Sequence, residues 1–188
     1  MRPDKETGTS GGVMTSYNRV CRAIALPLGL LLLSACADSA AKPDVLHAMA
    51  PTQSQGLRLS NITAEAKSGV VMTGADLDRI VAQVKADITG RDPNIFVDKT
   101  VSPNVMKIEF TEYDSGNAFA RFMLMGLGQI KIDADVTIVD SSNNQVIGEY
   151  DVSKDFAFGG VYGGVTRIED VEKGFAKSVA EIVAQQTS

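Results

Sequence analysis

The sequence predicts an α+β domain in which four mainly antiparallel strands form one sheet and two amphipathic helices cover one face of it. Three observations support this: strict alternation of apolar residues in the second half of the chain, two segments with helical apolar spacing, and a composition that is 44% hydrophobic and 22% charged. That composition is typical of a globular protein. The predicted architecture is a two-layer sandwich with the order β-α-β-β-β-α.

The first strand and the first helix are predicted at the start of the domain. The strand begins near Leu57, and Thr73 followed by Asp76 has the spacing of a capping box at a helix start. Apolar residues then recur every three or four positions, at Leu77, Ile80, Val84 and Ile88. This spacing places them on one face of an amphipathic helix, which Gly90 and Pro93 end.

Three further strands and a final helix are predicted in the second half. The strands are VMKIEF (105–110), IKIDADVTIVD (130–140) and QVIGEYDVSKDFAF (145–158), the last two joined by an SSNN turn. Their alternation predicts one buried and one solvated face. A capping box from Thr166 to Glu169 opens the helix, whose apolar stripe is Ile168, Val171, Phe175, Val179 and Ile182.

The N-terminus has the pattern of a bacterial lipoprotein signal peptide. Arg19 and Arg22 precede the apolar run 23–33, which is shorter than the roughly 20 residues that a membrane-spanning helix needs. The next tetrapeptide, Leu33-Ser34-Ala35-Cys36, resembles the lipobox. In a lipobox the cysteine is acylated, with palmitate among the usual chains, and becomes the first mature residue.

The predicted organisation follows from this signal. Residues 1–35 are the signal peptide, for which Met14 is a better start than Met1. Residues 36–55 are the lipidated cysteine and a flexible tether that contains His47, and residues 56–188 are a single domain. Because Ala37 rather than Asp follows the cysteine, the chain resembles lipoproteins sorted to the outer membrane. We expect a lipid-anchored domain that faces the periplasm.

Charge and residue content argue against several functions. Removing residues 1–35 leaves 14 basic and 21 acidic side chains and a net charge of −7, which argues against nucleic-acid binding. His47 is the only histidine, Cys21 is removed with the signal, and Cys36 is acylated. These losses exclude Ser-His and Cys-His catalysis and thiolate metal sites, so we predict a protein that is not an enzyme and has no cofactor.

Four acidic residues are predicted to share one sheet face. They are Asp133, Asp135, Glu149 and Asp151. Such a patch could bind a divalent cation such as Ca²⁺ weakly. An ordinary solvated face is the favoured interpretation, because perturbed acids need burial. No metal site is therefore assigned.

The stretch GNAFARFMLMGLG, residues 116–128, has several interpretations. It is too short to span a membrane, and its Gly-x-Gly precedes a strand, whereas the dinucleotide motif opens a helix. The GGVYGG segment (159–164) does precede a helix and could meet an anion, but a turning connection is favoured. Packing of 116–128 against the core is favoured over exposure to lipid or a partner. An exposed surface would offer the side chains of Phe119, Arg121, Phe122, Met123, Leu124 and Met125.

Several short motifs resemble a known family. YDSGNA (113–118), ARF (120–122), GLG (126–128) and a strand that ends in Val-Asp (139–140) resemble a family of bacterial lipoproteins that carry domain of unknown function 4410. The resemblance runs from about Gly56 to the end. It departs from the family at Gln129, where a small residue is frequent, and in the turn, which lacks Thr-Gly. It implies a small periplasm-facing lipoprotein domain and transfers no catalytic residue.

Two functions are favoured by this sequence, and a third, an enzyme that acts through acidic residues, is the least favoured. The favoured one is a non-enzymatic outer-membrane lipoprotein that acts as a binding or assembly module and meets an envelope protein partner through residues 116–128. The alternative is an auxiliary lipoprotein of an envelope transport system that handles lipid or another apolar cargo, which rests on fold-level analogy.

Overall fold

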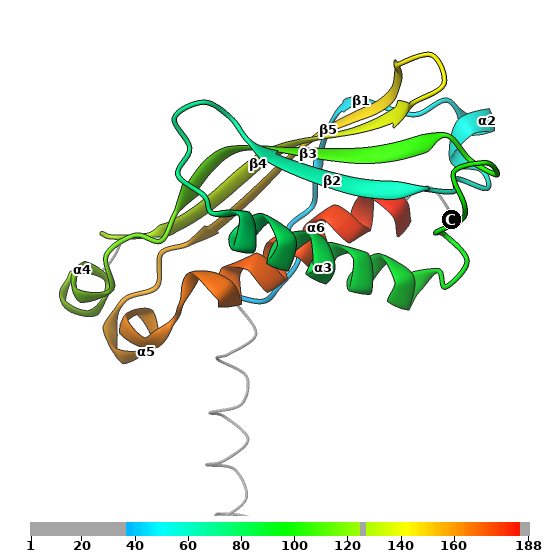
Figure 1. The fold of residues 1–188 in the computed structure, drawn as a ribbon. Coiled ribbons are helices and arrows are strands. Elements are labelled where there is room, and N and C mark those ends of the chain that lie inside the picture. Colours follow the sequence, from blue (N-terminus) through cyan, green and yellow to red (C-terminus); the bar gives the residue numbers. More distant parts are fainter. Residues whose placement is uncertain (1–36, 125–126, 185–188) are drawn as a thin grey trace, which may run out of the picture. The chain divides into compact units, whose positions relative to one another are not determined.

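A mixed five-stranded sheet forms one layer of the structure, with the strand order β1-β5-β4-β3-β2 (Figure 1). This computed structural model describes residues 37–124 and 127–184. The strands are β1 (Asp44–His47), β2 (Asn61–Ala66), β3 (Asn104–Asp114), β4 (Ile130–Asp140) and β5 (Gln145–Phe156). β2 pairs with β3 in parallel, and the other neighbouring strands pair antiparallel.

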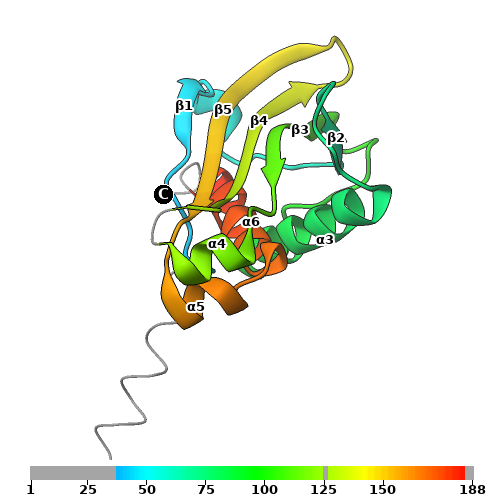
Figure 2. The same ribbon diagram turned by 90° about the vertical axis from the view of Figure 1, so that its left-hand side faces the viewer.

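Two long helices form the second layer on one face of this sheet. They are α3 (Gly74–Arg91) and α6 (Ile168–Ala184), which lie side by side in Figures 1 and 2. Three short helices complete the domain: α2 (Pro51–Ser54), α4 (Ala118–Met123) and α5 (Gly160–Val165). Figure 2 looks onto the end of the sheet where α4 and α5 lie together. Among the described residues, none of the helices is long and apolar enough to cross a membrane.

The predicted α+β class is confirmed, and the predicted counts of strands and helices are wrong. The series β2-α3-β3-β4-β5-α6 reproduces the expected order, and α3 and α6 are the two expected helices. The structure adds β1 and three short helices. β2 lies parallel to β3 because α3 is a crossover connection between them, and the sequence pattern does not show direction.

The helices form where the spacing and the capping residues predict them. Ile80, Val84 and Ile88 of α3 are fully buried. The backbone N–H of Thr73 donates to the carboxylate of Asp76 at 2.9 Å, and the Thr73 hydroxyl accepts from the Asp76 N–H. Hydrogen bonds from Thr73 lower the pKa of Asp76 to about 2.

The cap of α6 differs from the one predicted. The backbone N–H of Arg167 donates to the carboxylate of Asp170 at 3.2 Å. The hydroxyl of Thr166, which was expected to cap the helix, donates to the carbonyl of Tyr162. The helix therefore begins one residue later than the Thr166–Glu169 box indicates, because Asp170 supplies the acceptor.

A buried polar cluster joins the two long helices to β3. The carboxylate of Glu172 in α6 is fully buried and accepts from Arg79 Nε at 2.7 Å, from Arg79 Nη2 at 2.6 Å and from the Tyr113 hydroxyl at 2.6 Å. The hydrogen bond to Glu172 raises the pKa of Arg79. Burial, followed by the hydrogen bond to Glu172, raises the pKa of Tyr113. Every member of the cluster has a partner, as a buried charge requires.

Residues 37–47, which we name the N-terminal strap, pack along the domain. Ala37 is 3% exposed, the Ala41 N–H donates to Ser178 Oγ at 2.7 Å, and Lys177 Nζ donates to the Asp38 carboxylate at 2.6 Å. The strap ends in β1, which pairs with β5.

The prediction of a flexible tether over 36–55 is therefore wrong for the described residues, which begin at Ala37. All four residues of β1 are exposed, so this edge strand has no apolar alternation to reveal it. The backbone partners that β5 supplies stabilise it instead. His47, predicted to lie in a linker, stands in β1 opposite Glu149.

Gly174 of α6 allows the strap to approach the helix. A Cβ at this position would lie 2.5 Å from the backbone oxygen of Ala37 and 2.9 Å from that of Ser39. Gly90 of α3 offers a matched comparison, because a Cβ there would meet nothing within 4 Å.

We expect Gly174→Ala to destabilise the domain by about 1–3 kcal/mol, because the added methyl group displaces the strap. Gly90→Ala should instead stabilise it by up to about 1 kcal/mol, since alanine is the better helix former. Chemical denaturation measures both changes. A stabilisation of the same size in both variants would show that the strap does not need the space at Gly174.

Candidate functional site

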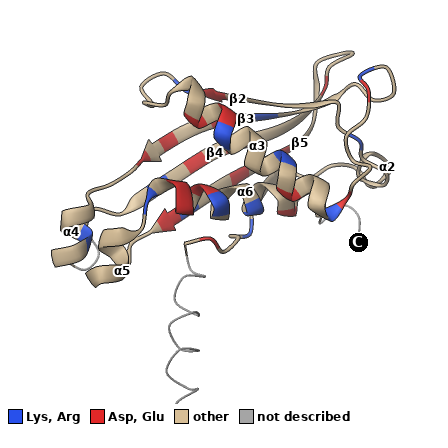
Figure 3. Ribbon diagram, turned by 60° about the horizontal axis from the view of Figure 1, so that its bottom comes forward, with Lys and Arg blue, Asp and Glu red and all other residues tan. Residues whose placement is uncertain are grey.

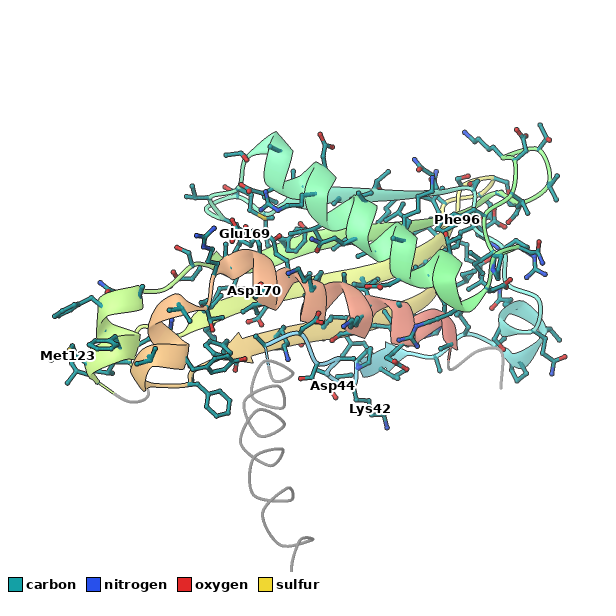
Figure 4. All side chains as sticks on the ribbon, turned by 90° about the horizontal axis from the view of Figure 1, so that it is seen from below. Lys42, Asp44, Phe96, Met123, Glu169 and Asp170 are labelled. Atoms are coloured by element: carbon teal, nitrogen blue, oxygen red, sulfur yellow. The ribbon has the colours of Figure 1, made fainter. Side chains whose placement is uncertain are left out.

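Two short helices at one end of the domain, with the residues next to them, carry a cluster of exposed apolar side chains. We name this cluster the α4–α5 patch. Its members are between 48% and 73% exposed, and they are Phe119, Phe122, Met123, Leu124, Leu127, Phe158, Val161 and Val165. Figure 4 shows Met123 at the end of the domain opposite to Phe96.

The favoured prediction, that residues 116–128 pack against the core, is wrong for these side chains. Phe119 is 73% exposed, and Phe122, Met123 and Leu124 are also exposed. The sequence showed that the stretch is apolar, but it did not show that α5 would cover only one side of α4. Met125, the remaining predicted contact residue, lies outside the described residues.

A hollow separates the exposed faces of α4 and α5. Its volume is about 320 Å³, and it is lined by Ala118, Phe119, Phe122, Val161, Gly164 and Val165. None of these side chains carries a polar group, so the hollow offers packing surface but no side-chain hydrogen bond. Apolar lining without convergent polar groups favours contact with another apolar surface over chemistry on a small substrate.

Arg121 holds the two helices together from inside. Its side chain is in α4, is 3% exposed, and donates only to backbone carbonyls. The acceptors are Gly163 for Nε at 2.9 Å, Ser115 and Gly128 for Nη1 at 3.1 and 2.6 Å, and Thr166 for Nη2 at 3.1 Å. Burial lowers the pKa of Arg121, and the charge of Asp114 opposes this effect. The prediction of Arg121 as a contact residue is therefore wrong, because its guanidinium is buried beneath the patch and fixes the helices that carry it.

The glycine after α4 closes the loop that Arg121 occupies. Gly128 has φ +68°, and a Cβ there would lie 2.5 Å from the carbonyl oxygen of Asn117. The Asn117 N–H donates to the Gly128 carbonyl at 3.1 Å, and the Asn117 side chain caps α4 by accepting from the Ala120 N–H. Gly128 is thus required by backbone geometry and close packing.

Aromatic side chains attach α5 to the end of β5. The rings of Phe156, Phe158 and Tyr162 lie 5.5 to 6.1 Å apart between centroids. Phe156 is buried and Phe158 is exposed. This cluster therefore connects the core to the α4–α5 patch.

The face of the sheet that the helices leave open carries a row of acidic residues. Adjacent strands place one acid each in register across the whole sheet, and the row is Asp44, Asp151, Asp135, Glu109 and Glu65. Of the four acids predicted to share a patch, Asp135 and Asp151 lie directly opposite each other. Asp133 lies opposite Ser153, and Glu149 lies opposite Thr137.

The other three members of the row could not be predicted, because the sequence does not show the register between strands.

At Asp151 the charges of the row make ionisation less favourable. Burial, followed by the charges of Asp135, Asp133 and Asp44, raises the pKa of the Asp151 carboxyl. Within residues 37–124 and 127–184, no group of three or more His, Cys, Asp or Glu side chains is arranged to hold a metal ion. The acidic row is therefore a negatively charged surface whose members repel one another.

The motif residues of the α4 loop lie in a region that this chain shares with known proteins. The family model described as Domain of unknown function (DUF4410) matches residues 42–160. The chain belongs to this family. The matched region contains α4, Arg121, Gly128 and the start of α5, so it includes most of the segment that builds and supports the patch.

Solved structures of low sequence identity are also similar to this chain. A PelC dodecamer from Paraburkholderia phytofirmans has 10% identity and a TM-score of 0.48, and the alignment covers 72% of this chain and 92% of that one. A Xanthomonas campestris protein of the DUF330 family has 13% identity and a TM-score of 0.39, with 78% and 91% covered. Neither similarity supports a statement about function. A comparison with curated protein sequences finds no match.

We expect Arg121→Ala to destabilise the α4–α5 end by about 3 kcal/mol or more, because it leaves several carbonyls without a donor. Arg121→Lys should destabilise this end less than Arg121→Ala does but should not reach the stability of the wild type. The reason is that one ammonium group cannot reach four diverging acceptors. Hydrogen exchange of residues 118–123 and 160–165 detects the loss even where the sheet stays folded. The neighbouring exposed Arg167 is the control, and Arg167→Ala should leave this exchange unchanged. Equal amide hydrogen exchange in all variants would contradict the role of Arg121 in holding α4 and α5 together.

We expect Asp151→Asn to stabilise the domain near neutral pH. The folded chain raises the pKa of Asp151 above its ordinary value of 3.8, so it binds this proton more tightly than the unfolded chain does. Stability therefore falls as pH rises from about 3.8 through the folded pKa. The gain from the substitution should be present at about pH 7, disappear at about pH 3, and shrink in high salt.

Thermal unfolding at several pH values measures this gain. Asp155→Asn is the control, because Asp155 lies opposite Lys131 in the sheet. An equal gain in stability in the two variants, or a gain that persists in acid, would rule out repulsion within the acidic row as its cause.

Proposed function

We propose that this protein is a non-enzymatic outer-membrane lipoprotein that works as a binding or assembly module in the bacterial envelope, with the α4–α5 patch as its contact surface. The observation that carries the proposal is an exposed apolar surface on a rigid base. The exposed side chains belong to α4, α5 and the segments next to them, and the base is the buried guanidinium of Arg121.

The energetics of the patch support a contact role. Burying a large apolar side chain fully contributes about 1.5–3 kcal/mol, and these side chains are 48% to 73% exposed. Soluble domains rarely leave a contiguous patch of this kind uncovered without a use for it. The four carbonyl contacts of Arg121 fix the two helices before any partner arrives, so little conformational entropy is lost on docking.

The lipid anchor of the proposal is Cys36, which lies outside the described residues. Its support is the lipobox after a short apolar run and the resemblance to lipoproteins without Asp after the cysteine. The outer membrane and a periplasmic orientation belong to the same proposal. The absence of enzymatic activity rests on the sequence, which has a single histidine and no cysteine after Cys36.

The hollow between α4 and α5 supports one alternative, an auxiliary role in the transport of lipid or another apolar cargo. Its lining is apolar and its volume is about 320 Å³. A cargo protein should retain bound lipid after purification, and native mass spectrometry would detect that lipid. A contact module should not retain it.

We expect a photoreactive amino acid at position 119 to form an adduct with an envelope component in intact cells, because Phe119 is the most exposed ring of the patch. Val161→Asp should abolish the adduct by placing a charge beside the hollow. The matched control is Val101→Asp, since Val101 and Val161 are both 71% exposed and only Val161 belongs to the patch. Adducts that persist equally in both variants would reject the patch as the contact surface.

A further inference from the structure

We propose that the occupant of the α4–α5 patch is the lipid surface of the bilayer that holds the acyl chains of Cys36. The proposal rests on the proposed function and names the partner of its contact surface. Three observations carry it: the short distance between Cys36 and the folded domain, the position of the patch relative to that attachment point, and the distribution of charge.

The folded domain begins one residue after the lipidation site. Ala37 follows Cys36 directly, is 3% exposed and packs against Gly174 of α6. Asp38 is held by Lys177, and Ala41 by Ser178, both on the same helix. One residue spans at most about 3.6 Å, so acyl chains on Cys36 keep α6 next to the headgroups. Within the described residues, which begin at Ala37, no flexible segment separates the domain from Cys36.

The patch lies near this attachment point. Gly174 is less than two helical turns, or roughly 9 Å, beyond the start of α6. Only Thr166 and Arg167 separate that start from α5, and Arg121 binds the carbonyl of Thr166. In Figures 1 and 4 the first described residues run beside the beginning of α6, on the helical side of the sheet and towards the α5 end. An anchored domain therefore brings the patch to the same bilayer.

The charges are distributed as this orientation requires. The only charged residue of α4 and α5 is Arg121, which is buried. Figure 3 shows α4 and α5 almost free of charge and both signs along α3 and α6. The row Asp44, Asp151, Asp135, Glu109 and Glu65 lies on the sheet face that the helices do not cover. Anionic headgroups repel acidic side chains, so the neutral end faces lipid and the acidic face points away.

The chemistry of the patch suits the interfacial zone of a bilayer. Phenylalanine, leucine, methionine and valine on short helices can enter the boundary between headgroups and acyl chains, to a depth of about 5–10 Å. An acyl anchor joined to such a patch supplies two membrane-binding signals, which together fix orientation as well as attachment.

The test uses the full-length protein, acylated in cells and reconstituted into vesicles of phosphatidylethanolamine and phosphatidylglycerol. Acylation consumes the thiol of Cys36, and Cys21 is removed with the signal, so Val161→Cys supplies the single reactive thiol for an environment-sensitive fluorophore. Val101→Cys is the control with the same exposure, and Leu124→Cys is a second position in the patch. Doxyl-labelled lipids then quench fluorophores that enter the bilayer.

We expect several-fold stronger quenching at positions 161 and 124 than at 101, with a blue-shifted emission at the two patch positions. Equal quenching at all three positions, or none at 161 and 124, would overturn the proposal. The adducts at position 119 in cells report separately on the proposed function. Protein adducts together with unquenched fluorophores would leave a contact module standing and reject lipid as its occupant.

Discussion

The burial of one guanidinium among backbone carbonyls is the constraint on which the α4–α5 end of this protein depends. A buried cation without a carboxylate partner is stable only if its donors are satisfied by other acceptors. Arg121 meets this requirement with carbonyls from two separate segments, the loop around α4 and the segment formed by α5 and the turn after it. The same bonds that solvate the charge also fix the helices that carry the exposed apolar side chains.

The sheet gives the molecule two unlike faces. Helices α3 and α6 cover one face with apolar contacts and the Glu172–Arg79 pair, whereas the other face carries acids in register on all five strands. Like charges directly opposite each other on neighbouring strands reduce stability. At Asp151, burial and then the charges of Asp135, Asp133 and Asp44 raise the pKa. An acidic face of this kind repels anionic surfaces.

Much of the fold could be predicted because its signals are local. The spacing of Ile80, Val84 and Ile88 and the alternation along β4 each lie within a single element, and both elements have the expected buried faces. The exposed edge strand β1, the parallel direction of β2 and the acidic row depend on pairing between distant segments. The same holds for Arg121, whose acceptors Gly163 and Thr166 follow it by more than forty residues. Its burial could not be inferred from an apolar stretch that contains one charge.

The N-terminal strap also determines when the fold can be completed. The ion pair between Asp38 and Lys177 joins residues that are 139 positions apart, and the hydrogen bond from Ala41 to Ser178 joins residues 137 apart. Contacts of such long sequence separation form late, because loop-closure entropy opposes them until the elements between are in place. Because the chain is synthesised from its N-terminus, the first segment of the domain can pack only after the last helix has been made. The residues that would sit closest to the lipid are therefore the last to be fixed.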